Sequence, residues 1–233
     1  MEGRGLRLVV WNCKGGFRSK QSALKCLLPD IAIIPEAPED FAQGLPISAL
    51  SSLWIGTKAV RGLGVVALNG WTLERVDVDV KERLFLPCVA TRGTDRIQLI
   101  AVCAQKTTDY VSPTLGVLQN QLDFIRGGPT IFAGDFNGSV SFRRRRKPFQ
   151  LVIDSLDYLD MRSAWHHFHG EKLGEETVNT YFMHHDPEKG SHIDYAFVSQ
   201  AFGVKAVRIG SYPEWSRLSD HAPLSVDLCL PLD

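Results

Sequence analysis

The sequence predicts an α/β protein in which β-sheets pack together and helices lie outside them. Short apolar runs, rich in β-branched and aromatic residues, recur along the chain between Gly, Pro, Asn and Asp. Several are apolar at nearly every position (IAII, LIAVC), which is typical of strands buried on both faces. Segments with helical spacing lie between some of these runs. Many strands with a few helices favour layered packing.

The strands that this pattern predicts cover residues 6–11, 31–34, 64–68, 84–91, 97–103, 130–133, 193–198, 204–209 and 224–228. Three helices are expected. Residues 19–28 begin at a Ser cap and end before Pro29, and residues 114–125 have apolar residues at helical spacing before Gly127. Residues 148–156 carry a Pro near the first turn of the third helix.

Length and composition indicate one ordinary globular domain over residues 1–233. The chain is 44% hydrophobic and 22% charged, and 26 Lys and Arg balance 26 Asp and Glu. A domain of this length buries enough surface to need no disulfides. The zero net charge produces no overall field that would attract nucleic acid or an anionic membrane, so any such signal must be local.

The protein is expected to be cytoplasmic, with no membrane span. The first apolar run, residues 6–11, is too short for a signal peptide, and no run approaches the ~20 apolar residues of a spanning helix. The five cysteines are scattered without a C-x-x-C pair, which favours reduced thiols.

Polar residues stand at the ends of the predicted strands: Asn12, Glu36, Asp135, Asn137 and the Asp220-His221 pair. Strand ends in α/β proteins present side chains to a shared crevice. Oxygen ligands of this kind suit Mg²⁺, and a histidine beside them can transfer a proton near neutral pH. Taken singly, each has a structural alternative as a turn residue, a solvated loop acid or a helix cap.

The order of these residues is more specific than any one of them. A strand with Trp-Asn, a strand with Pro-Glu, then GDFN, HIDY and SDHAPL follow one another between residues 6 and 228. This series resembles the endonuclease/exonuclease/phosphatase superfamily, which includes exonuclease III-like and deoxyribonuclease I-like nucleases, inositol-phosphate phosphatases and sphingomyelinases. Residues 163–177 with HIDYAFVS are similar to a bacterial branch whose substrates we do not assign.

The resemblance implies a four-layer α/β sandwich, two mixed β-sheets packed face to face with helices on the outer faces, and a site at one edge. It also implies roles for individual residues. Glu36 would be the main ligand of Mg²⁺ or Mn²⁺, helped by Asn12, and Asp220 would contact the metal directly or through water. Metal-assisted attack of water on phosphorus is the chemistry that this ligand set would support.

The remaining roles concern water and phosphate. Asp135 would orient or deprotonate the attacking water, and Asn137 would donate a hydrogen bond to the phosphate. His221 would bind or protonate a phosphoryl oxygen, with Asp194 holding its ring. A carboxylate behind an imidazole fixes the tautomer and raises the basicity of the ring.

Two segments depart from the family pattern. The strand at residues 97–103 lacks the His or Tyr expected soon after it. Lys106 or Tyr110 would substitute there, although a solvated loop is the better-supported reading, and a strand-end thiol such as Cys103 is not proposed as a nucleophile. The second departure is the basic run at 143–147, where Arg143, Arg144 and Arg145 would contact phosphate; a solvated loop explains that run equally well.

The histidine-rich region near residue 166 does not predict zinc, since no pair has H-E-x-x-H spacing. His192 and Tyr181 are candidates for the substrate pocket, and a core position is the alternative for Tyr181.

We therefore expect a monomeric, Mg²⁺-dependent phosphoester hydrolase, with a nuclease acting on DNA or RNA as the first hypothesis. A phosphatase or phosphodiesterase of a small or lipid-linked phosphoester is the second. A binding module that kept the fold without activity is the third. It is disfavoured because seven of the site residues that the resemblance implies are all present: Asn12, Glu36, Asp135, Asn137, Asp194, Asp220 and His221.

Overall fold

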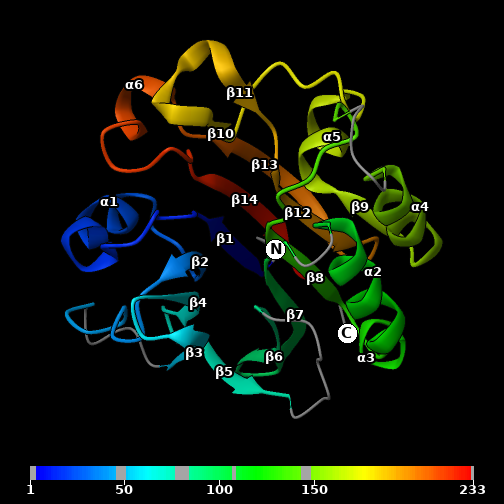
Figure 1. Cartoon of the computed structure of the whole chain (residues 1–233). Helices are drawn as coiled ribbons and strands as arrows, with labels where there is room; N and C mark the ends of the chain where they lie inside the picture. Colours follow the sequence, from blue (N-terminus) through cyan, green and yellow to red (C-terminus); the bar gives the residue numbers. More distant parts are fainter. Residues whose placement is uncertain (1–3, 46–50, 77–83, 107–108, 143–147, 232–233) are drawn as a thin grey trace.

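The computed structural model describes residues 4–45, 51–76, 84–106, 109–142 and 148–231. Within them, the longer strands form two mixed sheets (Figure 1). The order in the first sheet is β13 (Gly203–Ile209), β14 (Leu224–Cys229), β1 (Gly5–Val10), β2 (Ile31–Ala37), β4 (Arg61–Ala67) and β3 (Ser51–Lys58). The order in the second is β5 (Thr72–Arg75), β6 (Phe85–Arg92), β7 (Asp95–Cys103), β8 (Thr130–Asp135), β12 (Asp194–Ser199) and β9 (Met161–Ser163).

Both sheets use the same pattern of strand directions. The pairs β1–β2 and β7–β8 are parallel, and their other neighbours are antiparallel. Parallel neighbours end at the same edge of a sheet. The loops after β1 and β2, and likewise those after β7 and β8, are therefore brought together.

The central strands bury both faces. In β1, Leu8 and Val10 face the core between the two sheets, whereas Val9 packs against the outer layer. This alternation follows from the two-residue period of a strand. It explains why three consecutive residues of β1, 8–10, are all apolar.

Helices cover the two outer faces (Figure 1). The short helices η1 (Phe17–Lys20), α1 (Gln21–Cys26) and α6 (Tyr212–Trp215) cover the first sheet. The helices α2 (Val111–Asn120), α3 (Leu122–Arg126) and α4 (Gln150–Tyr158) cover the second. The expected four-layer sandwich is thus confirmed.

Shorter elements complete the chain around this sandwich. Helix α5 (Ala164–His169) contacts strands of both sheets, β12 and β13. The small hairpin of β10 (Tyr181–Phe182) and β11 (Gly190–Ser191) encloses two 3-10 turns, η2 (Met183–His185) and η3 (Pro187–Lys189). No helix in the described residues has the length and apolar character needed to cross a membrane.

Helix boundaries were the least accurate expectations. The helix predicted at 114–125 begins earlier, at Val111, because Asp109 accepts hydrogen bonds from the backbone N–H and hydroxyl of Ser112. It is also divided into α2 and α3 at Gln121, whose φ of −111° is not helical. The segment predicted at 19–28 is a 3-10 turn followed by the short α1, and the third predicted helix starts at Gln150 rather than 148.

The strand pattern missed edge strands. β3 has only half-buried or exposed residues, and Gly56 lies within it, so it lacks an uninterrupted apolar run. An edge strand is covered less completely than a central one, and its sequence carries a weaker signal.

Candidate active site

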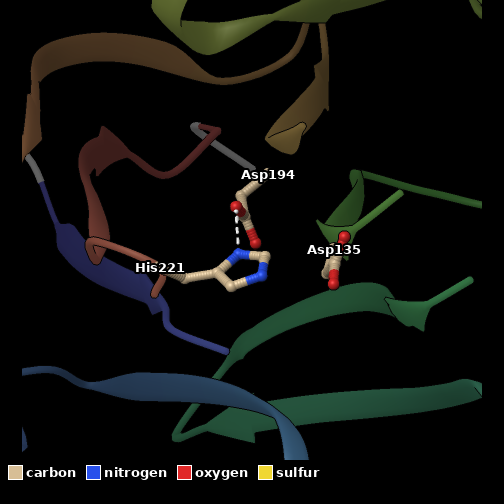
Figure 2. A group of neighbouring side chains, drawn as sticks. All are labelled: Asp135, Asp194 and His221. Atoms are coloured by element: carbon tan, nitrogen blue, oxygen red, sulfur yellow. Dashed lines mark hydrogen bonds and ion pairs between the residues drawn. The ribbon is translucent and has the colours of Figure 1, made fainter. Parts of the chain in front are cut away.

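The polar residues at the strand ends meet at one edge of the sandwich. Asp135 is the last residue of β8 and Asp194 the first of β12, and the two are direct cross-strand partners. His221 comes from the loop before β14. Its imidazole lies between the two carboxylates, with one ring nitrogen toward each (Figure 2).

His221 and Asp194 form a buried ion pair. The Nδ1 atom of His221 lies 2.8 Å from Asp194 Oδ2, and the two residues are 5% and 1% exposed. Burial alone would lower the pKa of His221. The charge and hydrogen bond of Asp194 oppose this, and together with the smaller effects of the Asp135 and Asp220 charges they raise that pKa to about 9. The ring is therefore an imidazolium at neutral pH, and its Nε2 can donate a hydrogen bond.

Asp135 is surrounded by amide donors. Its Oδ2 accepts from Asn12 Nδ2 at 2.9 Å and from Asn137 Nδ2 at 3.1 Å, and its Oδ1 accepts from the Asn137 backbone N–H at 2.9 Å. Burial and the charge of Asp194 nevertheless raise the pKa of Asp135 to about 7, against the opposing effects of His221 and these hydrogen bonds. A carboxyl with this pKa can accept a proton near neutral pH.

Glu36 is directed by an irregularity in β2. The register of the β2–β4 pair shifts between Pro35 and Ala37, and Glu36 between them has a φ of 59°. A β-bulge re-aims a side chain in this way. The Oε2 atom of Glu36 is buried without a hydrogen-bond partner, and Arg61 Nε lies 3.4 Å from it.

Asp220 has a cationic partner that the sequence did not identify. Lys14 Nζ lies 2.8 Å from Asp220 Oδ2 and 2.9 Å from His185 Nε2. The backbone N–H of Lys14 also donates to Asn12 Oδ1 at 3.0 Å. Lys14 thus connects the loop after β1 with the loop that carries Asp220.

Backbone contacts position the 220–222 segment. The backbone N–H groups of Phe182 and Ala222 donate to Asp220 O and Thr180 O, each at 2.8 Å, and Trp11 Nε1 donates to His221 O at 3.1 Å. The Tyr181 ring lies 4.7 Å from the His221 ring, between centroids. Burial raises the pKa of Tyr181, and the nearby negative charges of Asp220, Asp135 and Glu36 add to this.

The donor set fits a divalent cation. Glu36 offers a buried oxygen that lacks a hydrogen bond, and Asn12 Oδ1 keeps a free lone pair beside its bond to Lys14 N. Hard oxygen ligands of this kind suit Mg²⁺ or Mn²⁺. Asp135, Asp194 and His221 also place ligand atoms within 4.8 Å of one another. A protonated imidazole has no lone pair for a metal, so we favour Glu36 and Asn12 as the ligands.

A pocket of about 370 Å³ opens beside Glu36 and Asn137. Lys106 and Tyr110 line it. These are the two residues that the sequence offered in place of the His or Tyr expected directly after residues 97–103. Cys103 also reaches the pocket, but it is buried, and burial, with Asp135 and Glu36 nearby, raises the pKa of its thiol well above the usual range. A thiol in that state is a poor nucleophile.

Some predicted residues are not brought to this group. His192 is 3% exposed and packs against Trp165, His166 and Tyr195, with Nδ1 3.0 Å from Val178 O. Burial lowers its pKa. The predicted phosphate contacts Arg143, Arg144 and Arg145 lie outside the described residues.

Lys14 and Arg61 were missed by the sequence reasoning. Lys14 stands two residues after Asn12, so its proximity to the site could have been noticed. Arg61 begins β4 after a tight hairpin and had no sequence signal, because its closeness to Glu36 depends on the β2–β4 pairing.

Comparisons with known proteins agree with this geometry. Residues 114–221 match the model of the Endonuclease/Exonuclease/phosphatase family. The structure is similar to that of an endonuclease/exonuclease/phosphatase from Beutenbergia cavernae, with a TM-score of 0.68 and 16% identity over 98% of this chain and 72% of that one. The search of curated proteins found no match.

Two further structures are similar over nearly their whole length. The 3'-5' exonuclease of Neisseria meningitidis has a TM-score of 0.69 and 20% identity, over 95% of this chain and 98% of that one. A humanized D. rerio TDP2 has a TM-score of 0.69 and 16% identity, over 96% and 98%. At these low identities, the two similarities support the fold of this chain.

Proposed function

We propose that this chain belongs to the endonuclease/exonuclease/phosphatase superfamily, that it is a metal-dependent hydrolase of phosphoesters, and that its substrates are nucleic-acid strands. The family match over residues 114–221 and the similarity of the fold support this proposal. The observation that carries the proposal is the His221 imidazole held between Asp194 and Asp135. This arrangement places a hydrogen-bond donor and a proton acceptor side by side. Both are needed for attack of water on phosphorus.

The side chains divide the reaction between them. Asp135 accepts the proton of the attacking water as the new oxygen–phosphorus bond forms and the bond from phosphorus to the leaving oxygen breaks. The leaving oxygen takes up a proton from solvent. His221 donates its Nε2 hydrogen to a phosphoryl oxygen on which negative charge develops, and Asp194 keeps the ring protonated and oriented. A divalent cation held by Glu36 and Asn12 would supply further positive charge for the same oxygens.

Nucleic acid as the substrate is supported by the structural neighbours. The Neisseria protein is also described as a 3' phosphatase bound to a product DNA hairpin, and D. rerio TDP2 is described with a single-strand DNA product. Small phosphoesters are the second candidate, because the pocket of about 370 Å³ beside Glu36 could enclose one.

Cleavage of end-labelled DNA and RNA in Mg²⁺ tests the proposal, with Asp135→Asn beside the wild type. Asp123→Asn is a matched control, because Asp123 is exposed on α3, away from the site. We expect cleavage by the wild type and the control, and a loss on the order of 10²–10³ in rate for Asp135→Asn. Hydrolysis of small phosphomonoesters without any strand cleavage would favour the second candidate. Activity that persists in EDTA or in Asp135→Asn would contradict the mechanism.

A further inference from the structure

The pocket beside Glu36 carries two cationic side chains that the mechanism does not use. Arg61, from the start of β4, and Lys106, after β7, line it together with the exposed Gln105 amide. The two come from different sheets, because β4 belongs to the first sheet and β7 to the second. The pocket therefore spans the two halves of the sandwich at the edge where the site lies.

Both cations have N–H donors that are available to a ligand. The side chain of Arg61 is 61% exposed, and within the described residues its ion pair is the 3.4 Å contact from Nε to Glu36 Oε2. A guanidinium has five N–H donors, so the other N–H groups of Arg61 remain available to an incoming group. Among the residues that the structure describes, Lys106 has no hydrogen-bond or ion-pair partner.

The charge of the pocket favours an anion. Among the described residues that line the pocket, Glu36 is the one carboxylate, against the two cations Arg61 and Lys106. The planar fork of Arg and the point charge of Lys are the two groups with which proteins bind phosphate.

The position of the pocket says where that anion would lie. Asn137 lines the pocket and also donates its backbone N–H to Asp135 Oδ1. Glu36 likewise belongs both to the pocket and to the candidate metal site. An anion bound there would therefore lie next to the reacting phosphate.

We propose that Arg61 and Lys106 bind a second phosphate of the substrate, the one adjacent to the phosphate that is hydrolysed. This rests on the proposed function and narrows it. The preferred substrate is a strand with a phosphate on each side of one nucleoside, rather than an isolated phosphoester. The ammonium of Lys106 thereby takes the place of the aromatic or imidazole group expected after residues 97–103.

Binding of thymidine dinucleotides in EDTA tests the subsite without requiring cleavage. TpT has one phosphate, and pTpT and TpTp add a second on the 5' or the 3' side. We expect calorimetry to show that one of the latter two binds the wild type about tenfold more tightly than TpT, which is the usual effect of one charged hydrogen bond. The preferred isomer identifies the side on which the pocket lies.

The variants Arg61→Gln and Lys106→Gln should each reduce this preference severalfold. Lys205→Gln, which removes an exposed positive charge on β13, should leave it unchanged. Equal binding of the three dinucleotides, a preference that survives in both variants, or no binding at millimolar concentration would overturn the subsite. Cleavage of longer strands in Mg²⁺ reports separately on the proposed function, so the failure of one is distinguishable from the failure of the other.

Discussion

Asp135 and Asp194 lie directly opposite each other on the antiparallel strands β8 and β12, and each is 1% exposed. Two buried carboxylates at a cross-strand position repel each other, so the fold keeps this pair at a cost in stability. The His221 imidazolium and the amides of Asn12 and Asn137 offset part of that repulsion. The presence of this destabilising pair is therefore best explained by the role of the two carboxylates in the proposed reaction.

The charge of Asp194 should control the protonation of His221. In Asp194→Asn we expect the pKa of His221 to fall from about 9 toward its ordinary value of 6.5, because the buried ring loses its counter-ion. NMR titration of the imidazole in EDTA measures this directly. Asp154→Asn, an exposed change on α4, serves as the control and should leave the titration unaltered. If Asp194→Asn left the pKa of His221 unchanged, Asp194 would not be the group that stabilises the protonated imidazole.

The metal-free protein should lose stability as the pH rises from about 7 to 9.5. The folded-state pKa of His221, about 9, lies above the value of 6.5 for the free side chain. The stabilisation is thus fully present below pH 6.5 and is lost as the pH passes through 9. Melting temperatures in EDTA measure the slope, and His221→Gln should flatten it. An equally steep slope in the variant would assign the effect to other groups.

Mg²⁺ should raise the melting temperature of the wild type. At 100 times its dissociation constant, a ligand that binds only the folded state stabilises it by about 2.7 kcal/mol. Glu36→Gln should abolish most of this rise, because it removes the charged ligand. Glu39→Gln changes an exposed acid just after β2 and should keep the full rise. A rise that survives in Glu36→Gln would move the metal to other residues, with the Asp135–Asp194 pair as the first alternative.

Gly134 is required by the approach of β7 to β8. Its φ is 146°, and an added Cβ atom would lie 2.0 Å from the carbonyl oxygen of Val102, its partner in the parallel pair. Gly134→Ala should therefore destabilise the protein by at least ~3 kcal/mol or prevent folding, since rigid backbone has to shift. Gly93→Ala, at a turn with open space around it, should cost about 1 kcal/mol. Chemical denaturation compares the two, and similar losses would contradict this account.

Much of the fold could be predicted because the central strands are buried on both faces. Strands β1 and β7 contain runs of consecutive apolar residues, 8–10 and 99–103, and the positions of both strands were predicted closely. Edge strands such as β3 were missed, since partial exposure removes that signal. The boundaries of α2 depended on Asp109, a capping residue that stands outside the apolar pattern.

The apolar runs of the sequence by themselves predicted packed sheets with outer helices, and the order of its motifs pointed to the sandwich and to the residues that the structure gathers around His221. Only the tertiary structure decided which of these residues touch. Three contacts of the site join residues that are well separated in the sequence: the cross-strand pair Asp135–Asp194, the ion pair Lys14–Asp220 and the contact of Arg61 with Glu36. Such contacts depend on strand pairing and bulges, and a linear pattern of residue types does not encode those distances. The same reason explains why His192, two residues from Asp194, lies in a separate buried cluster.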